Sequence, residues 1–260
     1  MPKRTSYSQG TPNWVDLQTS DQDAAKSFYG PLFGWTFDDQ AMPQGPPYSM
    51  ALKGGDFVGA IAPLPQELAA RGDPPFWNTY IAVDDVDAAT AAVKGAGGQV
   101  AMEPFDVMDA GRMSAVTDPG GATVCLWQAK EHIGARLVNE PGALIWNELI
   151  TDEPDASFAF YHEVLGLDSE LSDMGGNPYT LLKVGDDMVA GSMPPPMEGV
   201  ANHWHVYFGV EDLDASLEQA RGLGAGVIAG PIPTPIGSMA TLSDPQGALF
   251  SLFQLTGQPD

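Results

Sequence analysis

Cysteine and basic residues are scarce in this chain of 260 residues. Cys125 is the single cysteine, so no intramolecular disulfide can form, as is usual for proteins of reducing compartments. Lys and Arg number 11 against 34 Asp and Glu, which gives a formal net charge of −23. A surface this acidic repels phosphate backbones and anionic headgroups, so we expect no nucleic-acid partner and no binding to membrane surfaces.

Long apolar runs and nucleotide-binding motifs are also missing. No run approaches the roughly 20 apolar residues that cross a bilayer, and residues 1–14 lack the apolar core of a signal peptide. We therefore expect a cytoplasmic protein without membrane insertion, with non-classical export as the alternative. No nucleophile elbow or phosphate loop occurs, and the GAGG at 95–98 follows a predicted helix instead of opening one, which excludes a dinucleotide fingerprint.

Glycine, proline and apolar residues, by contrast, are plentiful. Hydrophobic residues make up 43% of the chain, enough for a sizeable core. The 30 glycines and 23 prolines favour many short strands joined by turns over a helical bundle.

The chain repeats itself. The segment around Trp14 recurs around Trp146, 132 positions later, with FY pairs at the same spacing. WNTYIAVDDVDA from Trp77 matches WHVYFGVEDLDA from Trp204, and DPGGATVCLWQ matches DPQGALFSLFQ further on. We predict two related domains, 1–130 and 140–260, separated by the irregular stretch KEHIGARLVNEPG.

Each half contains two similar units of the form strand, helix, three strands. In the first unit, side chains alternate between two faces over 14–17, as in a strand, and apolar residues follow at helical spacing over 24–33. Thr19, Ser20 and Asp21 are the N-cap candidates of this helix, and Gly34 is the candidate C-cap. Further strands are predicted at 35–37, 48–52 and 57–62, and the second unit repeats the order over 79–128. The proline-rich stretches 40–47, 63–75 and 193–202 are predicted loops. The pattern alone indicates an α+β fold.

Helices that end in FYGPLFGW or FYHEVLGL, each followed later by a DPxGA turn, resemble the vicinal oxygen chelate superfamily. That superfamily includes glyoxalase I, extradiol dioxygenases and bleomycin-binding proteins. The resemblance covers nearly the whole chain, once per half. It implies four βαβββ modules forming two glyoxalase-like domains, in which paired modules enclose a cavity. Which modules pair is left open.

The resemblance also implies where a divalent ion would be held. The first-strand position falls on Trp14 and Trp146, and the strands 60–62 and 191–193 offer no acid or histidine. The remaining positions fall on Asn78, His205, Cys125 and Ser251. Because an indole cannot coordinate such an ion, we expect no metal and no cofactor. A divalent metal is the less favoured alternative, held by Glu148, His203 and His205.

Carboxylates and aromatic residues are the other candidates for a site in these cavities. Asp16 and Glu148 lie two residues after the tryptophans, so each shares a strand face with its tryptophan. With His205 they are the candidate catalytic groups. The predicted ligand-binding set is Trp14, Asp16, Tyr48, Asn78, Tyr80, Arg112, Trp127, Trp146, Glu148, Tyr179, His205, Tyr207 and Phe253.

Each candidate also has a structural interpretation. The aromatic residues could simply pack a sheet, Arg112 could form a surface ion pair, and Cys125 could be a buried inert thiol.

Three functions follow from these observations. The favoured hypothesis is a metal-free protein that binds a small organic metabolite or antibiotic in aromatic-lined cavities, as a monomer or homodimer. The alternative is a glyoxalase-like lyase, epimerase or dioxygenase acting on a small carbonyl or phenolic substrate. The third is a structural or interaction role with both cavities closed.

Overall fold

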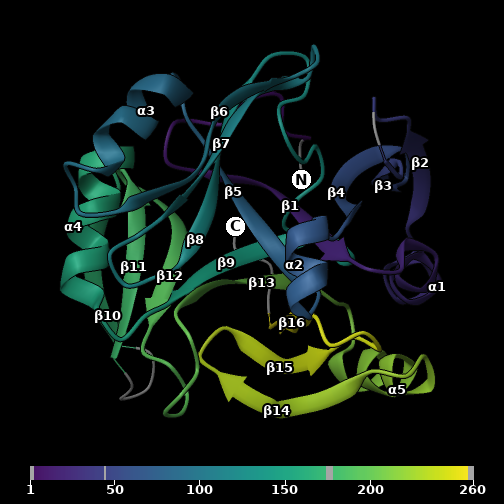
Figure 1. The fold of residues 1–260 in the computed structure, drawn as a ribbon. Helices are drawn as coiled ribbons and strands as arrows, with labels where there is room; N and C mark the ends of the chain where they lie inside the picture. The colour runs from purple at the N-terminus through teal and green to yellow at the C-terminus, as the bar shows by residue number, and fades with distance from the viewer. Residues whose placement is uncertain (1–2, 44, 174–177, 257–260) are drawn as a thin grey trace.

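The fold is that of a computed structural model, which describes residues 3–43, 45–173 and 178–256. Each half of the chain forms one eight-stranded sheet with helices on one side (Figure 1). This confirms the predicted α+β class and the four βαβββ modules. No helix within the described ranges is long and apolar enough to span a membrane.

The first half contains two consecutive modules that share one sheet. Its order is β2-β3-β4-β1-β5-β8-β7-β6, with β1 and β5 antiparallel at the centre. The pairing that the sequence left open is therefore between neighbouring modules. The elements are β1 (Pro12–Thr19), α1 (Gln22–Phe33), β2 (Thr36–Gln40), β3 (Tyr48–Lys53), β4 (Asp56–Pro63), α2 (Gln66–Arg71), β5 (Phe76–Ala82), α3 (Val86–Val93), β6 (Gln99–Val107), β7 (Gly111–Thr117) and β8 (Thr123–Ala129).

The second half repeats this arrangement. Its sheet order is β10-β11-β12-β9-β13-β16-β15-β14, with β9 and β13 antiparallel at the centre. The elements are β9 (Leu144–Ile150), α4 (Pro154–Leu165), β10 (Asp168–Asp173), β11 (Pro178–Val184), β12 (Asp187–Met193), β13 (His203–Gly209), α5 (Leu213–Gly222), β14 (Gly226–Thr234), β15 (Gly237–Ser243) and β16 (Leu249–Leu255).

Of the three N-cap candidates the structure uses Asp21, and the predicted C-cap Gly34 is present. The Asp21 carboxylate accepts a hydrogen bond from the Ala24 amide at 2.9 Å, and Gly34 ends α1 in the left-handed conformation at φ 69°. The prediction that 63–75 is entirely loop was wrong, because α2 lies within it. Pro65 directly precedes a run of strong helix formers there, and its fixed φ is compatible with a helix start.

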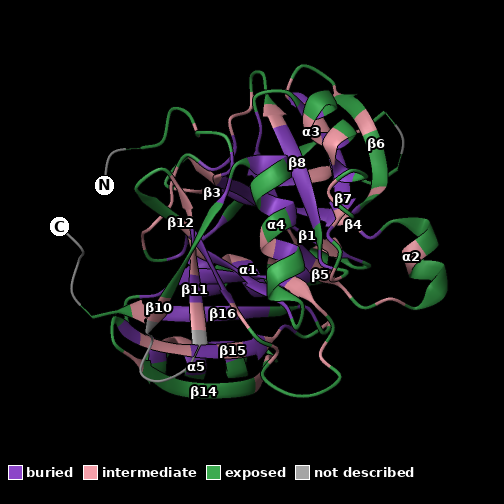
Figure 2. Cartoon of the chain, turned by 90° about the vertical axis from the view of Figure 1, so that its left-hand side faces the viewer, coloured by how far each residue is buried: buried purple, intermediate pink, exposed green. Residues whose placement is uncertain are grey.

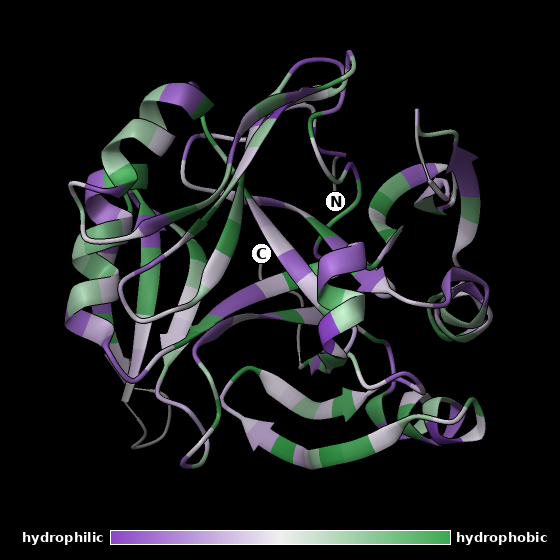
Figure 3. Cartoon of the chain, viewed as in Figure 1, coloured by the Kyte–Doolittle hydropathy of each residue, from purple (hydrophilic) through white to green (hydrophobic). Residues whose placement is uncertain are grey.

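The two sheets share their core. We call the side of each sheet on which α1 and α3, or α4 and α5, pack its helix face, and the opposite side its site face. In one cluster, Phe28 and Phe33 of α1 pack with Phe208 and Phe250 of the second half. The central strands are buried, whereas the edge strands β6 and β14 are exposed (Figure 2). Hydrophobic segments nevertheless occur along β14 (Figure 3).

Candidate functional site

Six residues share the site face of the first sheet at its centre. Strand alternation places Trp14 and Asp16 of β1 on this face, and the register sets Tyr80 opposite Trp14 and Asn78 opposite Asp16. On β8, Cys125 pairs with Tyr80 in parallel register, and Trp127 follows two residues later. The sheet thus brings together candidates from both modules of this half.

Asp16 is held by the protein's own donors. Its carboxylate is 1% exposed and accepts hydrogen bonds from Tyr80 (2.8 Å), Tyr48 (3.0 Å), Asn78 (2.9 Å) and Gln18 (2.9 Å). Burial raises the pKa of Asp16, and these four donors oppose the rise. Four donors occupy the two oxygens, so the carboxylate has little capacity left for another ligand.

The second half repeats this network with a longer carboxylate. In both halves an indole donates to the tyrosine hydroxyl, Trp14 to Tyr48 and Trp146 to Tyr179, each at 2.9 Å. Tyr207 donates to Glu148 at 2.6 Å, and Tyr179 is hydrogen-bonded to the same carboxylate.

Burial raises the pKa of Glu148, which is 4% exposed. Within the described part of the chain, two tyrosines bond to Glu148, against the four donors at Asp16, so Glu148 is the less constrained acid.

His205 lies opposite Glu148 in the register and belongs to a second polar chain. Its Nε2 is 2.8 Å from the Ser251 hydroxyl, which is in turn 2.9 Å from that of Thr241. Burial, together with nearby His203, lowers the pKa of His205 to about 3. His205 is therefore neutral at physiological pH, and its Nε2 shares a hydrogen bond with the Ser251 hydroxyl.

The residues at the positions that the resemblance implies for an ion do not fit a divalent cation. The indole nitrogens of Trp14 and Trp146 are engaged as donors to tyrosine. Cys125 is buried with a raised pKa, which disfavours the thiolate that binds metal. Within the described residues no group of three or more His, Cys, Asp or Glu side chains could hold an ion, and Glu148, His203 and His205 do not form one.

The stretch that joins the halves covers the site face of the first sheet. We call residues 130–138 the covering segment. The ring of His132 lies edge-on to Trp14, with centroids 4.5 Å apart, and also contacts Trp127 and Phe57. Ala135 is fully buried in the same cluster as Trp14. Sequence reasoning placed His132 only in a domain boundary, since an irregular segment has no periodicity that would show where it packs.

The second site face is more open. The counterpart of Phe57 on β12 is Met188, because Asp16 pairs with Ala60 as Glu148 pairs with Gly191. Met188 is 60% exposed, whereas Phe57 is half-buried.

Trp146 and Tyr179 at the centre of this face are also only half-buried, while Phe253 is 9% exposed. Aromatic surface is thus within reach of solvent in the second half, beside a carboxyl group that is itself buried.

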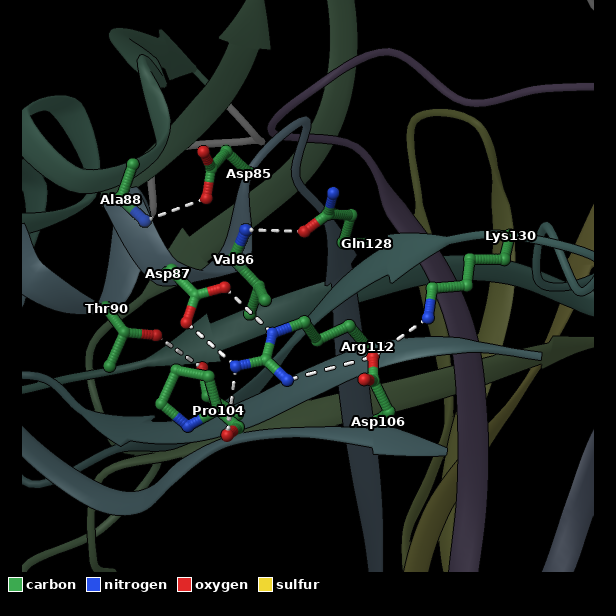
Figure 4. Close-up of polar contacts among 11 residues, drawn as sticks. Asp85, Val86, Asp87, Ala88, Thr90, Pro104, Asp106, Arg112, Gln128 and Lys130 are labelled. Carbon is green, nitrogen blue, oxygen red and sulfur yellow. Dashed lines mark hydrogen bonds and ion pairs between the residues drawn. The ribbon is translucent and has the colours of Figure 1, made fainter. Parts of the chain in front are cut away.

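Arg112 lies outside both site faces, contrary to its prediction as a ligand-binding residue. On β7 its neighbour Met113 packs in the Trp14 cluster, whereas Arg112 points the other way, toward α3. Its guanidinium makes two hydrogen bonds to Asp87, at 2.8 and 2.9 Å, and one to the Pro104 carbonyl (Figure 4). The alternative interpretation as an ion pair fits these contacts.

Comparisons with known proteins agree with this architecture. The model of the "Glyoxalase/Bleomycin resistance protein/Dioxygenase superfamily" matches residues 11–126 and 143–252. The chain is 59% identical to "Putative glyoxylase CFP32" of Mycobacterium bovis over 98% of both chains. It is 37% identical to "Anthracycline biosynthesis protein DnrV" of Streptomyces peucetius, over 96% of this chain and 95% of that protein.

Solved structures share the fold at low sequence identity. The 2,3-dioxygenase LapB of Pseudomonas sp. KL28 superimposes with a TM-score of 0.65 at 18% identity, covering 96% of this chain and 93% of that one. The Mn(II)-bound glyoxalase of Novosphingobium aromaticivorans gives a TM-score of 0.62 at 18% identity, covering 95% and 82%. With one family match in each half and a relative at 59% identity, the chain belongs to the glyoxalase/bleomycin resistance/dioxygenase superfamily as a tandem two-domain member.

Proposed function

We propose that the protein binds a small planar organic molecule, without a metal ion, on the site face of its C-terminal half. The observation that carries the proposal is one network found in both halves, in which an indole donates to a tyrosine hydroxyl and two tyrosines bond to a carboxyl group. Such a surface offers flat apolar contact and a few directed polar groups, which is the usual composition of an organic-ligand site.

The C-terminal half is the better candidate because fewer donors bond to its carboxyl group and its aromatic side chains are more exposed. Glu148 accepts from two tyrosines, and Trp146 and Tyr179 remain half-buried. The raised pKa of Glu148 favours its protonated form, which can donate a hydrogen bond to a carbonyl or hydroxyl oxygen of the ligand. The name of the Streptomyces relative, an anthracycline biosynthesis protein, makes polycyclic hydroxylated aromatic compounds the first class to examine.

The test measures binding of 1,8-dihydroxyanthraquinone as a probe by tryptophan fluorescence and calorimetry. Tyr179→Phe removes the hydroxyl that joins Trp146 to Glu148, and we expect it to weaken binding about tenfold, the effect of losing one hydrogen-bonding group at the site. Tyr48→Phe makes the same change in the covered half and should leave the affinity unchanged. Equal losses in the two variants, or no binding to the unmodified protein, would contradict the proposal.

The metal-free state is tested separately. Elemental analysis of the purified protein should find less than stoichiometric zinc, nickel, iron or manganese, and chelation should not change the probe's affinity. A tightly held stoichiometric ion would overturn this part of the proposal.

A second candidate function is proton transfer on a small carbonyl or phenolic substrate. It is favoured by Glu148, a buried carboxyl group whose pKa is raised by burial, which lies opposite the neutral imidazole of His205 on the adjacent strand. The relative named as a glyoxylase belongs with this candidate. Exchange of the α-proton of a small ketone in heavy water, followed by NMR, should then be accelerated by the protein and lost in Glu148→Gln; no acceleration by the unmodified protein would argue against it.

A further inference from the structure

We propose that the site face of the N-terminal half is a binding site for a planar, uncharged aromatic ring, and that the chain fills it with the imidazole of its own His132. The proposal rests on the proposed function in one respect only: it takes the C-terminal site face as the open copy of the same surface.

The surroundings of His132 are those of a bound aromatic guest. Its ring is flanked by Trp14, Phe57 and Trp127 at centroid distances of 4.5, 5.7 and 5.8 Å. The three interplanar angles are 85°, 78° and 73°, so every contact is edge-to-face. Edge-to-face packing is the arrangement that aromatic rings prefer for electrostatic reasons, and any flat ring of similar size could make it.

The ring is recognised by shape and not by its nitrogens. Nε2 of His132 is buried and has no hydrogen-bond partner among the residues that the structure describes. The polar bonds of this residue come from its backbone: its amide donates to the Ala110 carbonyl at 3.0 Å, and Trp127 donates to its carbonyl at 2.8 Å. Arg136 lies close enough to disfavour a cation at the ring. A neutral ring without hydrogen-bonding groups therefore suits the site at least as well as imidazole does.

The covering segment is anchored independently of this ring. The Ala135 amide donates to the Asn13 carbonyl at 2.8 Å, and the Asn13 side chain donates to the Ile133 carbonyl at 3.0 Å. Tyr7 donates to the Ala135 carbonyl at 2.6 Å. Removal of the His132 side chain should consequently leave a ring-shaped hole beneath a segment that stays in place, as truncation of buried side chains does in other well-packed sites.

The two halves show the effect of this occupancy. Phe57 is half-buried beneath His132, whereas its counterpart Met188 is 60% exposed. Trp14 is 3% exposed, whereas its counterpart Trp146 is half-buried. The two faces share their indole–tyrosine–carboxyl network, and the less exposed face is the one that the covering segment contacts.

The decisive experiment is chemical rescue of His132→Gly with imidazole at pH 8, where imidazole is mostly uncharged. We expect the variant to melt several degrees below the unmodified protein, and imidazole to restore the melting temperature with a Kd on the order of 1–10 mM. His132→Phe, which fills the same hole, is the matched control and should show no saturable response. Absence of rescue in His132→Gly, or an equal response in His132→Phe, would overturn the proposal.

If His132→Gly does not fold, the melting temperatures of His132→Phe and His132→Leu test instead whether the site prefers an aromatic ring. A ring-selective site keeps the Phe variant within a few degrees of the unmodified protein and places the Leu variant clearly lower. Equal stabilities would show that any apolar side chain suffices and would refute ring selectivity. Failure of the proposed function is distinguishable, since the unmodified protein would then not bind the anthraquinone while His132→Gly still bound imidazole.

Discussion

At the scale of single residues, one strand position carries different chemistry in the two halves. Asp16 and Glu148 occupy equivalent places, yet Asp16 accepts from four donors while the longer Glu148 is held by two tyrosines. Period-two alternation was sufficient to predict that each acid shares a face with its tryptophan. The donors could not be predicted, because Tyr48 and Tyr80 reach Asp16 only through the sheet order β3-β4-β1-β5.

His132 gives the first prediction at this scale. Burial and Arg136 lower its pKa from 6.5 to about 4, so the unfolded chain binds this proton more readily than the folded one. The stability that depends on neutral His132 is complete above pH 6.5 and is lost as the pH falls toward 4. Between pH 7.5 and 4.5 the loss should be about 2–3 kcal/mol.

Urea unfolding of the unmodified protein and of His132→Phe at both pH values measures this loss. The variant keeps the other titrating groups, including His205, so their contributions cancel in the difference between the two proteins. Between pH 7.5 and 4.5 the free energy of unfolding of the unmodified protein should fall by about 2–3 kcal/mol more than that of the variant. A parallel decline in both proteins would mean that His132 titrates in the folded state as it does in the unfolded chain.

At the scale of elements, the repeated units were the predictable part and the covering segment was not. The strand β1 has a clear alternation and the helix α1 has a clear apolar periodicity with caps, and the structure confirms both. The helix α2 was missed because proline density outweighed local propensity in the prediction. The covering segment has no period, and its position depends on hydrogen bonds to Asn13 and Phe57 more than 70 residues away.

Gly134 provides a test of how this segment is docked. It has φ +107°, and a Cβ there would lie 2.3 Å from the Asn13 carbonyl oxygen. Gly121 has a similar φ of +98° but open space around its Cβ position. Both alanine variants are destabilised by the left-handed backbone, so the difference between their free energies of unfolding measures the effect of the clash alone.

We expect Gly134→Ala to be about 1–3 kcal/mol less stable than Gly121→Ala. Hydrogen exchange should also become faster over residues 130–138 in Gly134→Ala, because the clash pushes the segment away from β1. Equal stability with unchanged exchange would show that the backbone moves aside without cost.

At the scale of the whole molecule, the motifs that carry the family resemblance also join the halves. Tyr29, from the FY pair of the first half, donates to Asp244 of the second-half DPxG turn at 3.0 Å, and Trp77 donates to the same hydroxyl at 3.3 Å. In the mirrored arrangement Trp204 donates to Tyr161, which is hydrogen-bonded to Asp118. Each half thus supplies a tyrosine to the turn of the other, and the site faces are held on opposite sides of one shared core.

This shared core predicts that the halves do not fold separately, even though each contains a complete sheet. Expressed alone, residues 1–136 would expose Phe28 and Phe33, and residues 137–260 would expose Phe208 and Phe250, which pack together in the intact chain. We expect each half alone to aggregate or to lack a cooperative thermal transition, and the two co-expressed halves to form a stable 1:1 complex. Size-exclusion chromatography and thermal melting check this, with the intact chain as the reference. A C-terminal half that is monomeric, melts cooperatively and binds the anthraquinone probe would show that the interface between the halves is dispensable and that the site face of that half is organised by its own sheet.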